Sequence, residues 1–167
     1  MSAADLIEKR TASLPTAKLV RRPSFDEVCT LAAERTAELL VEAVASRGSG
    51  HLALTGGSAG IALARSLPAT FAAAGISGSL LENVHLWFGD ERFVAAGDPD
   101  RNDLLVAGLV DAGLPDANVH RVRGPELVAG VDAAAAHLAE ELSATGPAEG
   151  RFDVVHLGVG PDAHVCS

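Results

Sequence analysis

The feature that most constrains this chain is a regular alternation of short apolar runs with segments of helical periodicity. The apolar runs predict strands, and they lie at 17–20, 51–55, 84–88, 118–122 and 152–157. The helical segments begin at Ser24, 61, 102 and 131. Strands that alternate with helices indicate βαβ units and a mostly parallel sheet. We therefore expect an α/β fold that is doubly wound and Rossmann-like, with helices on both faces of the sheet.

The first long helix has sequence signals at both of its ends. Ser24 followed three residues later by Glu27 is a capping box, and Gly48 predicts the helix end. Cys29 lies within this helical pattern, where we expect a small core residue. Cys166 stands far from it in the sequence, so the two cysteines predict neither a disulfide framework nor a metal pair.

The length of 167 residues suits one domain of ordinary size. We expect residues 1–167 to form a single α/β domain. The last predicted strand is followed by a loop but by no helix, which leaves one face of the sheet uncovered. The sequence therefore predicts a domain that is incomplete at its C-terminus, and a 167-residue polypeptide with low stability and little activity.

The charge and hydropathy of the chain exclude several classes of partner. The chain has 22 acidic and 13 basic residues and a net charge of −9, so DNA, RNA and anionic membranes are not expected partners. No apolar run approaches the roughly 20 residues of a membrane span. Residues 1–10 contain Asp5 and Glu8 and no apolar signal core, so we expect a cytoplasmic location.

Glycine-rich or charged segments directly follow three of the predicted strands. They cover 55–58, 89–92 and 158–164. In an open α/β sheet, ligands bind beyond the carboxyl ends of the strands. We therefore expect three segments that are far apart in the sequence to meet at one edge of the sheet, and this convergence is a stronger signal than any one segment.

The first of these segments, Gly56, Gly57 and Ser58, favours an anion site. Glycines let the backbone approach a ligand, and a helix N-terminus behind them offers free N–H groups and the positive end of a dipole. The segment is not a Walker A loop, because no Gly-Lys-Ser/Thr follows it. The alternative is a tight turn in which Ser58 caps the next helix.

The second segment places a carboxylate, Asp90, and a guanidinium, Arg92, at a strand end. Such a pair can orient a hydroxyl and hold a phosphate, and the alternative is a surface ion pair of little energetic value. Aspartates follow at 98, 100 and 103, but the calcium-loop pattern fails because Asp103 stands where its glycine belongs. We expect turn-forming and capping roles there and no metal.

The third segment contains Asp162 and His164. A histidine in a loop beyond a strand is a candidate general base, because its reference pKa lies near working pH, and the alternative is an ordinary loop histidine. The segment also matches a loose dinucleotide fingerprint, but an anionic Asp162 beside a pyrophosphate disfavours this. A pair of Cys166 with His164 lacks an evident orienting group. We expect packing or surface roles for the other five histidines.

Together these segments resemble those of one enzyme family. Thr-Gly-Gly-Ser at 55–58, Trp-Phe-Gly-Asp-Glu-Arg at 87–92, Asn102 and Gly-Val-Gly-Pro-Asp-Ala-His at 158–164 are similar to motifs of 6-phosphogluconolactonases, in the same order and at matching intervals. The resemblance runs from the first helix to the end of the chain, which corresponds to the larger part of a usual family member. The Asp-Glu-Arg and Gly-Pro-Asp-x-His segments together are its specific part.

This resemblance implies an activity and a set of site residues. The activity is hydrolysis of 6-phospho-D-glucono-1,5-lactone to 6-phosphogluconate in the oxidative pentose phosphate pathway, without cofactor or metal, by a monomer. Catalysis is assigned to His164 as the base, with Asp90. Binding of the phosphate and support of the site are assigned to the remaining matched positions, which are Gly56, Gly57, Ser58 and Arg92 for binding and Asn102 and Asp162 for support.

The chain departs from the family pattern at two places, and two related functions stay open. Ala59 and Gly60 stand where the family has Thr-Pro, and Ala163 stands where it usually has glycine, which bears on phosphate affinity and loop geometry. A glucosamine-6-phosphate deaminase has a similar fold but tends to carry tyrosine at the position of Arg92. A non-catalytic sugar-phosphate sensor module normally follows a helix-turn-helix domain, for which residues 1–23 leave no room.

Overall fold

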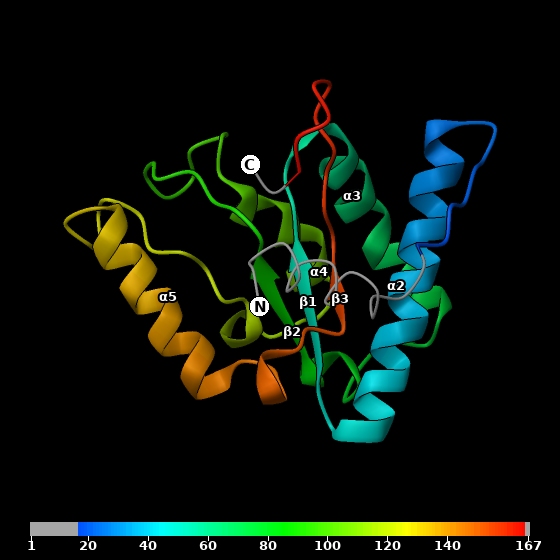
Figure 1. The fold of residues 1–167 in the computed structure, drawn as a ribbon. Coiled ribbons are helices and arrows are strands. Elements are labelled where there is room, and N and C mark those ends of the chain that lie inside the picture. The colour runs from blue at the N-terminus through cyan, green and yellow to red at the C-terminus, as the bar shows by residue number, and fades with distance from the viewer. Residues whose placement is uncertain (1–16, 166–167) are drawn as a thin grey trace, which may run out of the picture.

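The fold is built on a three-stranded parallel sheet, shown by a computed structural model that describes residues 17–165 (Figure 1). β1 (Gly50–Leu54) lies in the middle of the sheet. It pairs along its whole length with β2 (Val84–Phe88), from Gly50 opposite Val84 to Leu54 opposite Phe88. Its other edge pairs with the short β3 (Val154–Val155).

Helices cover both faces of this sheet. α2 (Phe25–Arg47) and α3 (Gly57–Ala73) lie on one side, and α5 (Val131–Thr145) lies on the other (Figure 1). The expected α/β fold, with a parallel sheet between helices, is confirmed. Shorter helical elements complete the fold: η1 (Leu81–Asn83), η2 (Asn102–Val106), α4 (Ala107–Asp111), η3 (Asp116–Asn118) and η4 (Ala148–Gly150).

The signals at the ends of α2 act as the sequence predicts. The Ser24 hydroxyl accepts the Glu27 backbone N–H at 3.2 Å and donates to the Glu27 carboxylate at 3.3 Å. Gly48 ends the helix at φ +83°, a conformation that glycine adopts without a Cβ clash. Cys29 is buried within α2, as expected for a core residue.

The core lies on the face of the sheet that α2 and α3 cover. Alternate residues of each strand point to this face, because successive side chains of a strand lie on opposite sides. Burying an apolar side chain of this size contributes about 1.5–3 kcal/mol relative to exposure, so this cluster holds the two helices on the sheet. Its members include Leu40, Leu52, Leu54, Leu67, Phe71, Val84, Leu86 and Phe88.

The opposite face of β1 and β2 carries Trp87 and three histidines. Trp87 stacks on His120 with ring centroids 3.7 Å apart, and His51 stacks on His85 at 4.7 Å. His120 Nδ1 lies 2.7 Å from the Glu141 carboxylate of α5. These histidines therefore pack between the sheet and α5, away from the carboxyl edge.

Five expected elements differ from the structure. The helix expected from 61 begins four residues earlier, at Gly57. Residues 17–22 form no strand, and Leu19 is 76% exposed. Residues 118–122 contribute only a bridge between Val119 and Leu86. The strand expected at 152–157 is reduced to β3, although backbone N–H groups of Asp153 and His156 still donate to β1 carbonyls. The helix expected at 102–110 is split into η2 and α4. A segment forms a strand only where a neighbouring strand pairs with it. An apolar run in the sequence does not show whether such a neighbour exists.

Candidate functional site

The three segments after β1, β2 and β3 line one pocket at the carboxyl edge of the sheet. The pocket has a volume of about 360 Å³. It contains six of the eight residues singled out from the sequence: Gly56, Gly57, Ser58, Asp90, Arg92 and His164. The other two, Asn102 and Asp162, do not line the pocket, but each is hydrogen-bonded to a residue that does.

The glycine segment leads directly from β1 into α3. Gly57 has φ +72°, which favours glycine, and a Cβ on Gly56 would lie 2.3 Å from Asn102 Oδ1. The N-cap of α3 is Gly56 and makes no side-chain cap bond, so the expected alternative of Ser58 as the cap is wrong. The first N–H groups of a helix lack intrahelical partners, and here they lie in the pocket wall, where an anion is favoured.

The segment after β2 sends its side chains in two directions. Asp90 and Arg92 line the pocket, whereas the Glu91 side chain is only 2% exposed and turns away from it. Asn102 lies outside the pocket and donates from Nδ2 to the Asp90 carbonyl at 2.9 Å. Asp103, for which the sequence predicted a turn or cap, is instead buried beside Arg101.

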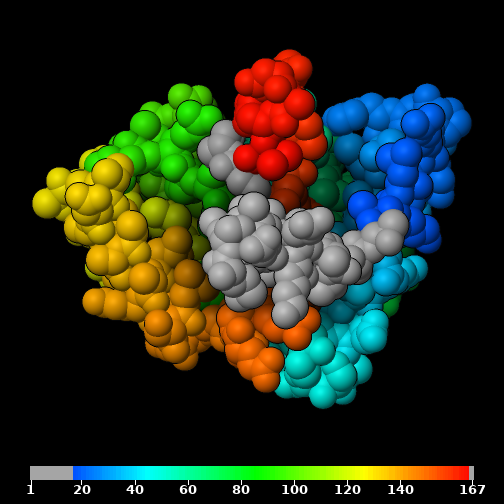
Figure 2. All heavy atoms as spheres, viewed as in Figure 1, coloured from blue at the N-terminus to red at the C-terminus, as the bar shows by residue number. Residues whose placement is uncertain are grey.

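The segment after β3 is a tight hairpin that carries His164, and it forms the red protrusion at the top of Figure 2. The Ala163 N–H donates to the Gly160 carbonyl, the Gly160 N–H donates to the His164 carbonyl, and both distances are 2.9 Å. Ala163 has φ +67°, the left-handed conformation that such loops usually give to glycine. The His164 ring packs directly on Gly160, where a Cβ would lie 2.1 Å from its Cε1.

Asp162 orients His164 within this hairpin. Its carboxylate is hydrogen-bonded to His164 Nδ1, and this bond lowers the pKa of Asp162. An ionised carboxylate only accepts hydrogen bonds, so it fixes the proton of a neutral imidazole on Nδ1. The Nε2 lone pair of His164 is then free to accept a proton.

A second histidine of the pocket wall was not predicted. His156 follows β3 and lines the pocket, with its Nε2 2.9 Å from the Thr36 hydroxyl of α2. Burial lowers its pKa to about 4, so it is uncharged at neutral pH. Its place near the end of a predicted strand, two residues before the glycine-rich segment, is the sequence signal that identifies it.

The remaining expectations concern metals, cysteines and membranes. Within residues 17–165, no group of three or more His, Cys, Asp and Glu side chains is arranged to hold a metal ion. Cys166 lies outside the described residues, and so does the pair with His164 that the sequence disfavours. Among the helices of the described part, none combines the length and the apolar character that crossing a membrane requires.

Comparisons with known proteins place this geometry in a family. The model of glucosamine-6-phosphate isomerases/6-phosphogluconolactonase matches residues 23–167. The chain is 39% identical over 161 residues to a 6-phosphogluconolactonase of Streptomyces coelicolor, which covers 91% of this chain and 60% of that protein. It is 38% identical over 152 residues to one of Mycobacterium tuberculosis, which covers 87% of this chain and 60% of that protein.

The solved structures agree with the sequence comparisons. The crystal structure of a 6-phosphogluconolactonase from Shewanella baltica aligns with a TM-score of 0.65 at 28% identity, covering 85% of this chain and 56% of that one. The chain thus spans 60% of the length of the two curated relatives. The chain belongs to the glucosamine-6-phosphate isomerase/6-phosphogluconolactonase family.

Proposed function

We propose that this pocket hydrolyses 6-phospho-D-glucono-1,5-lactone to 6-phosphogluconate, as a carboxylic ester hydrolase of the oxidative pentose phosphate pathway. The observation that supports this most is the single pocket in which a helix N-terminus, Arg92 and an Asp162-oriented His164 converge. The names of the relatives support the same reaction.

The phosphate is bound at the glycine segment. The first N–H groups of α3, at Gly57 and Ser58, and the Arg92 guanidinium supply the donors, and Arg92 is the one guanidinium among the described residues that line the pocket. Anchoring this remote group places the lactone carbonyl opposite the hairpin. Binding energy from a non-reacting group is thereby used to orient the reacting one.

Proton transfer is assigned to His164. Its Nε2 accepts a proton from water as the water oxygen attacks the lactone carbonyl carbon. The resulting tetrahedral intermediate collapses with cleavage of the bond to the ring oxygen, and the imidazolium returns the proton to that oxygen. The ionised Asp162 stabilises the imidazolium, and Asp90 orients substrate hydroxyls.

The rest of the proposal concerns the protein as a whole. We propose a cytoplasmic monomer with one catalytic α/β domain, without cofactor, metal or nucleic-acid partner. The second activity named by the family description is glucosamine-6-phosphate isomerisation, and Arg92 disfavours it on the resemblance stated above.

A substrate comparison tests the proposal. The protein as a whole is expected to accelerate hydrolysis of 6-phosphogluconolactone above its spontaneous rate and to leave unphosphorylated glucono-1,5-lactone nearly unaffected. Ammonia release from glucosamine 6-phosphate would identify a deaminase instead. Binding of 6-phosphogluconate without turnover of either substrate would identify a sensor module.

A further inference from the structure

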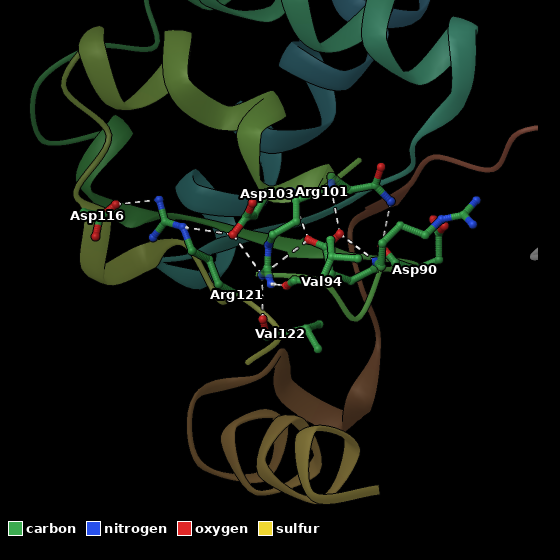
Figure 3. Close-up of polar contacts among 10 residues, drawn as sticks. Asp90, Val94, Arg101, Asp103, Asp116, Arg121 and Val122 are labelled. Carbon is green, nitrogen blue, oxygen red and sulfur yellow. Dashed lines mark hydrogen bonds and ion pairs between the residues drawn. The ribbon is translucent and has the colours of Figure 1, made fainter. Parts of the chain in front are cut away.

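A network of buried charges lies next to Asp90 (Figure 3). The side chains of Glu91 and Arg101 are 2% and 3% exposed, and Arg101 Nη2 lies 3.7 Å from Glu91 Oε2. The same guanidinium lies 3.0 Å from Asp103 Oδ2. We call Glu91, Arg101 and Asp103 the Arg101 cluster.

Glu91 holds the backbone of two segments, one that lines the pocket and one next to it. Its Oε1 accepts the N–H of Arg92 at 2.8 Å and that of Asn102 at 2.7 Å, and its Oε2 accepts the N–H of Asp103 at 2.9 Å. Hydrogen bonds to an ionised acceptor are about twice as strong as neutral ones. One carboxylate therefore joins the Asp90–Arg92 segment to the start of η2.

Arg101 holds the backbone that continues from this segment, two residues after Arg92. It donates to the carbonyl of Val94 at 3.1 Å and to that of Val122 at 2.7 Å. A planar guanidinium with several donors suits this bridging role, and the single ammonium of a lysine does not. The segment is therefore held at Arg92 by Glu91 and at Val94 by Arg101.

Asn102 extends the network to the phosphate side of the pocket. It donates to the Asp90 carbonyl at 2.9 Å, and its Oδ1 packs against Gly56 so closely that a Cβ there would lie 2.3 Å away. The Asn102 backbone is itself bound to Glu91. The spacing between the glycine segment and the Asp90 segment thus depends on the Arg101 cluster.

We propose that Glu91 and Arg101 are positioning residues, which set the distance and orientation of Asp90 and Arg92 relative to the N-terminus of α3. A buried ion pair is weak support for stability, because an apolar replacement of equal volume often stabilises a fold equally well. An apolar replacement here has no acceptor for three backbone N–H groups and no donor for two carbonyls. The pair therefore serves the geometry of the pocket wall, and its catalytic consequence rests on the proposed lactonase function.

Two Glu91 variants and one matched control separate geometry from charge. Glu91→Gln keeps the shape but turns an NH₂ donor toward backbone N–H groups or toward Arg101. Glu91→Asp keeps the charge, is the milder change for folding, and withdraws the carboxylate by one methylene. The control Glu141→Gln makes the same substitution at a carboxylate that contacts His120 between the sheet and α5, and Glu141 accepts no N–H from the Asp90–Arg92 segment.

The first measurement does not depend on activity. Amide hydrogen exchange at Arg92 and Asn102 is expected to accelerate about 10-fold or more in both Glu91 variants, because each N–H loses a charged acceptor. The amides of β1 keep their protection in the same molecules, which shows that the fold is intact. Unchanged exchange at Arg92 and Asn102, or equal acceleration in Glu141→Gln, overturns the proposal.

The second measurement is the lactone hydrolysis rate of the same variants. We expect kcat/KM to fall by about 10- to 100-fold in Glu91→Gln, because a displacement of ångström size at a site has this effect. Both kcat and KM change, since Asp90 and Arg92 move together, whereas Glu141→Gln keeps the wild-type KM. Absence of lactonase activity in the protein as a whole contradicts the proposed function, and the exchange measurement then decides the positioning proposal alone.

Discussion

His164 is the residue on which the proposed chemistry depends most. Its side chain is 49% exposed on a hairpin outside the core, so replacing it removes the base without disturbing the packing of the sheet. In the protein as a whole, we expect His164→Ala to lower kcat by about 10²- to 10⁴-fold, the usual contribution of a general base. Lactone hydrolysis measures the rate, and circular dichroism checks that the fold is kept. A variant with the normal rate would move the base assignment to Asp90.

Arg92 is expected to act on binding rather than on the chemical step. Arg92→Ala removes the guanidinium from the pocket wall but leaves the N–H groups of α3, so KM for the phosphorylated lactone rises while kcat changes little. Arg123→Ala is a matched control, because Arg123 is also exposed but does not line the pocket. Equal KM values for the two variants would show that the phosphate lies elsewhere.

Ala163 carries strain in the hairpin that holds His164. Its φ of +67° costs an L-residue about 1–2 kcal/mol. Replacing Ala163 by glycine removes this strain. The greater conformational freedom of glycine in the unfolded chain offsets about 0.4–1 kcal/mol of that gain in stability. We expect Ala163→Gly to slow amide exchange at Gly160 and Ala163, the N–H groups of the hairpin turn. Glu149→Gly, at φ +60° in a separate loop, is the control that leaves this exchange unchanged.

Among the elements, the histidines between the sheet and α5 link stability to pH. Burial, followed by the proximity of His85, lowers the pKa of His51 from 6.5 to about 4. His120 and Arg47 also disfavour the charged ring, and Asp153 opposes them. Between pH 6.5 and 4, the unfolded chain therefore binds a proton that the folded chain excludes.

This difference predicts a loss of stability in mild acid. The contribution of His51 is fully present above pH 6.5 and is lost as pH falls toward 4, with a slope of up to about 1.4 kcal/mol per pH unit. Trp87 Nε1 donates a hydrogen bond to His51 Nδ1 at 3.2 Å. A proton on His51 Nδ1 would therefore set two N–H donors against each other. Urea unfolding at several pH values measures the slope. His51→Gln should flatten it, leaving the similar contribution of His156, and an unchanged slope would exclude His51 as the source.

The elements also show what the sequence predicts and where it fails. β2 matches its expected range because a buried parallel strand reads as a continuous apolar run. Residues 17–20 have similar composition, yet they form no strand, since pairing depends on neighbours that are distant in sequence. The pocket is predictable because strand order places its three segments at one edge. The burial of Glu91 and Arg101 cannot be predicted from the sequence, because charged residues in a loop usually face solvent.

At the scale of the whole molecule, an apolar strip follows the outer edge of the sheet. Within residues 17–165, β3 pairs with β1 alone. The strip continues along the chain toward the hairpin, where large apolar side chains remain exposed. These are Val155 at 47%, Leu157 at 57%, Val159 at 72% and Val165 at 54%. Unpaired strand edges with apolar side chains favour pairing between molecules.

We therefore expect the isolated 167-residue polypeptide, unlike the monomer proposed for the protein as a whole, to associate with itself as its concentration rises. Leu157→Lys places a charge on the strip, which disfavours burial against a second copy, because an unpaired buried charge is costly. Sedimentation velocity over a concentration series measures the association, and this variant should shift it toward monomer. Leu127→Lys is the matched control, since Leu127 is 66% exposed in a loop apart from the strip, and it should associate like the wild type. A wild-type chain that stays monomeric at every concentration, or a Leu127→Lys variant that dissociates as readily as Leu157→Lys, would show that the strip does not drive association.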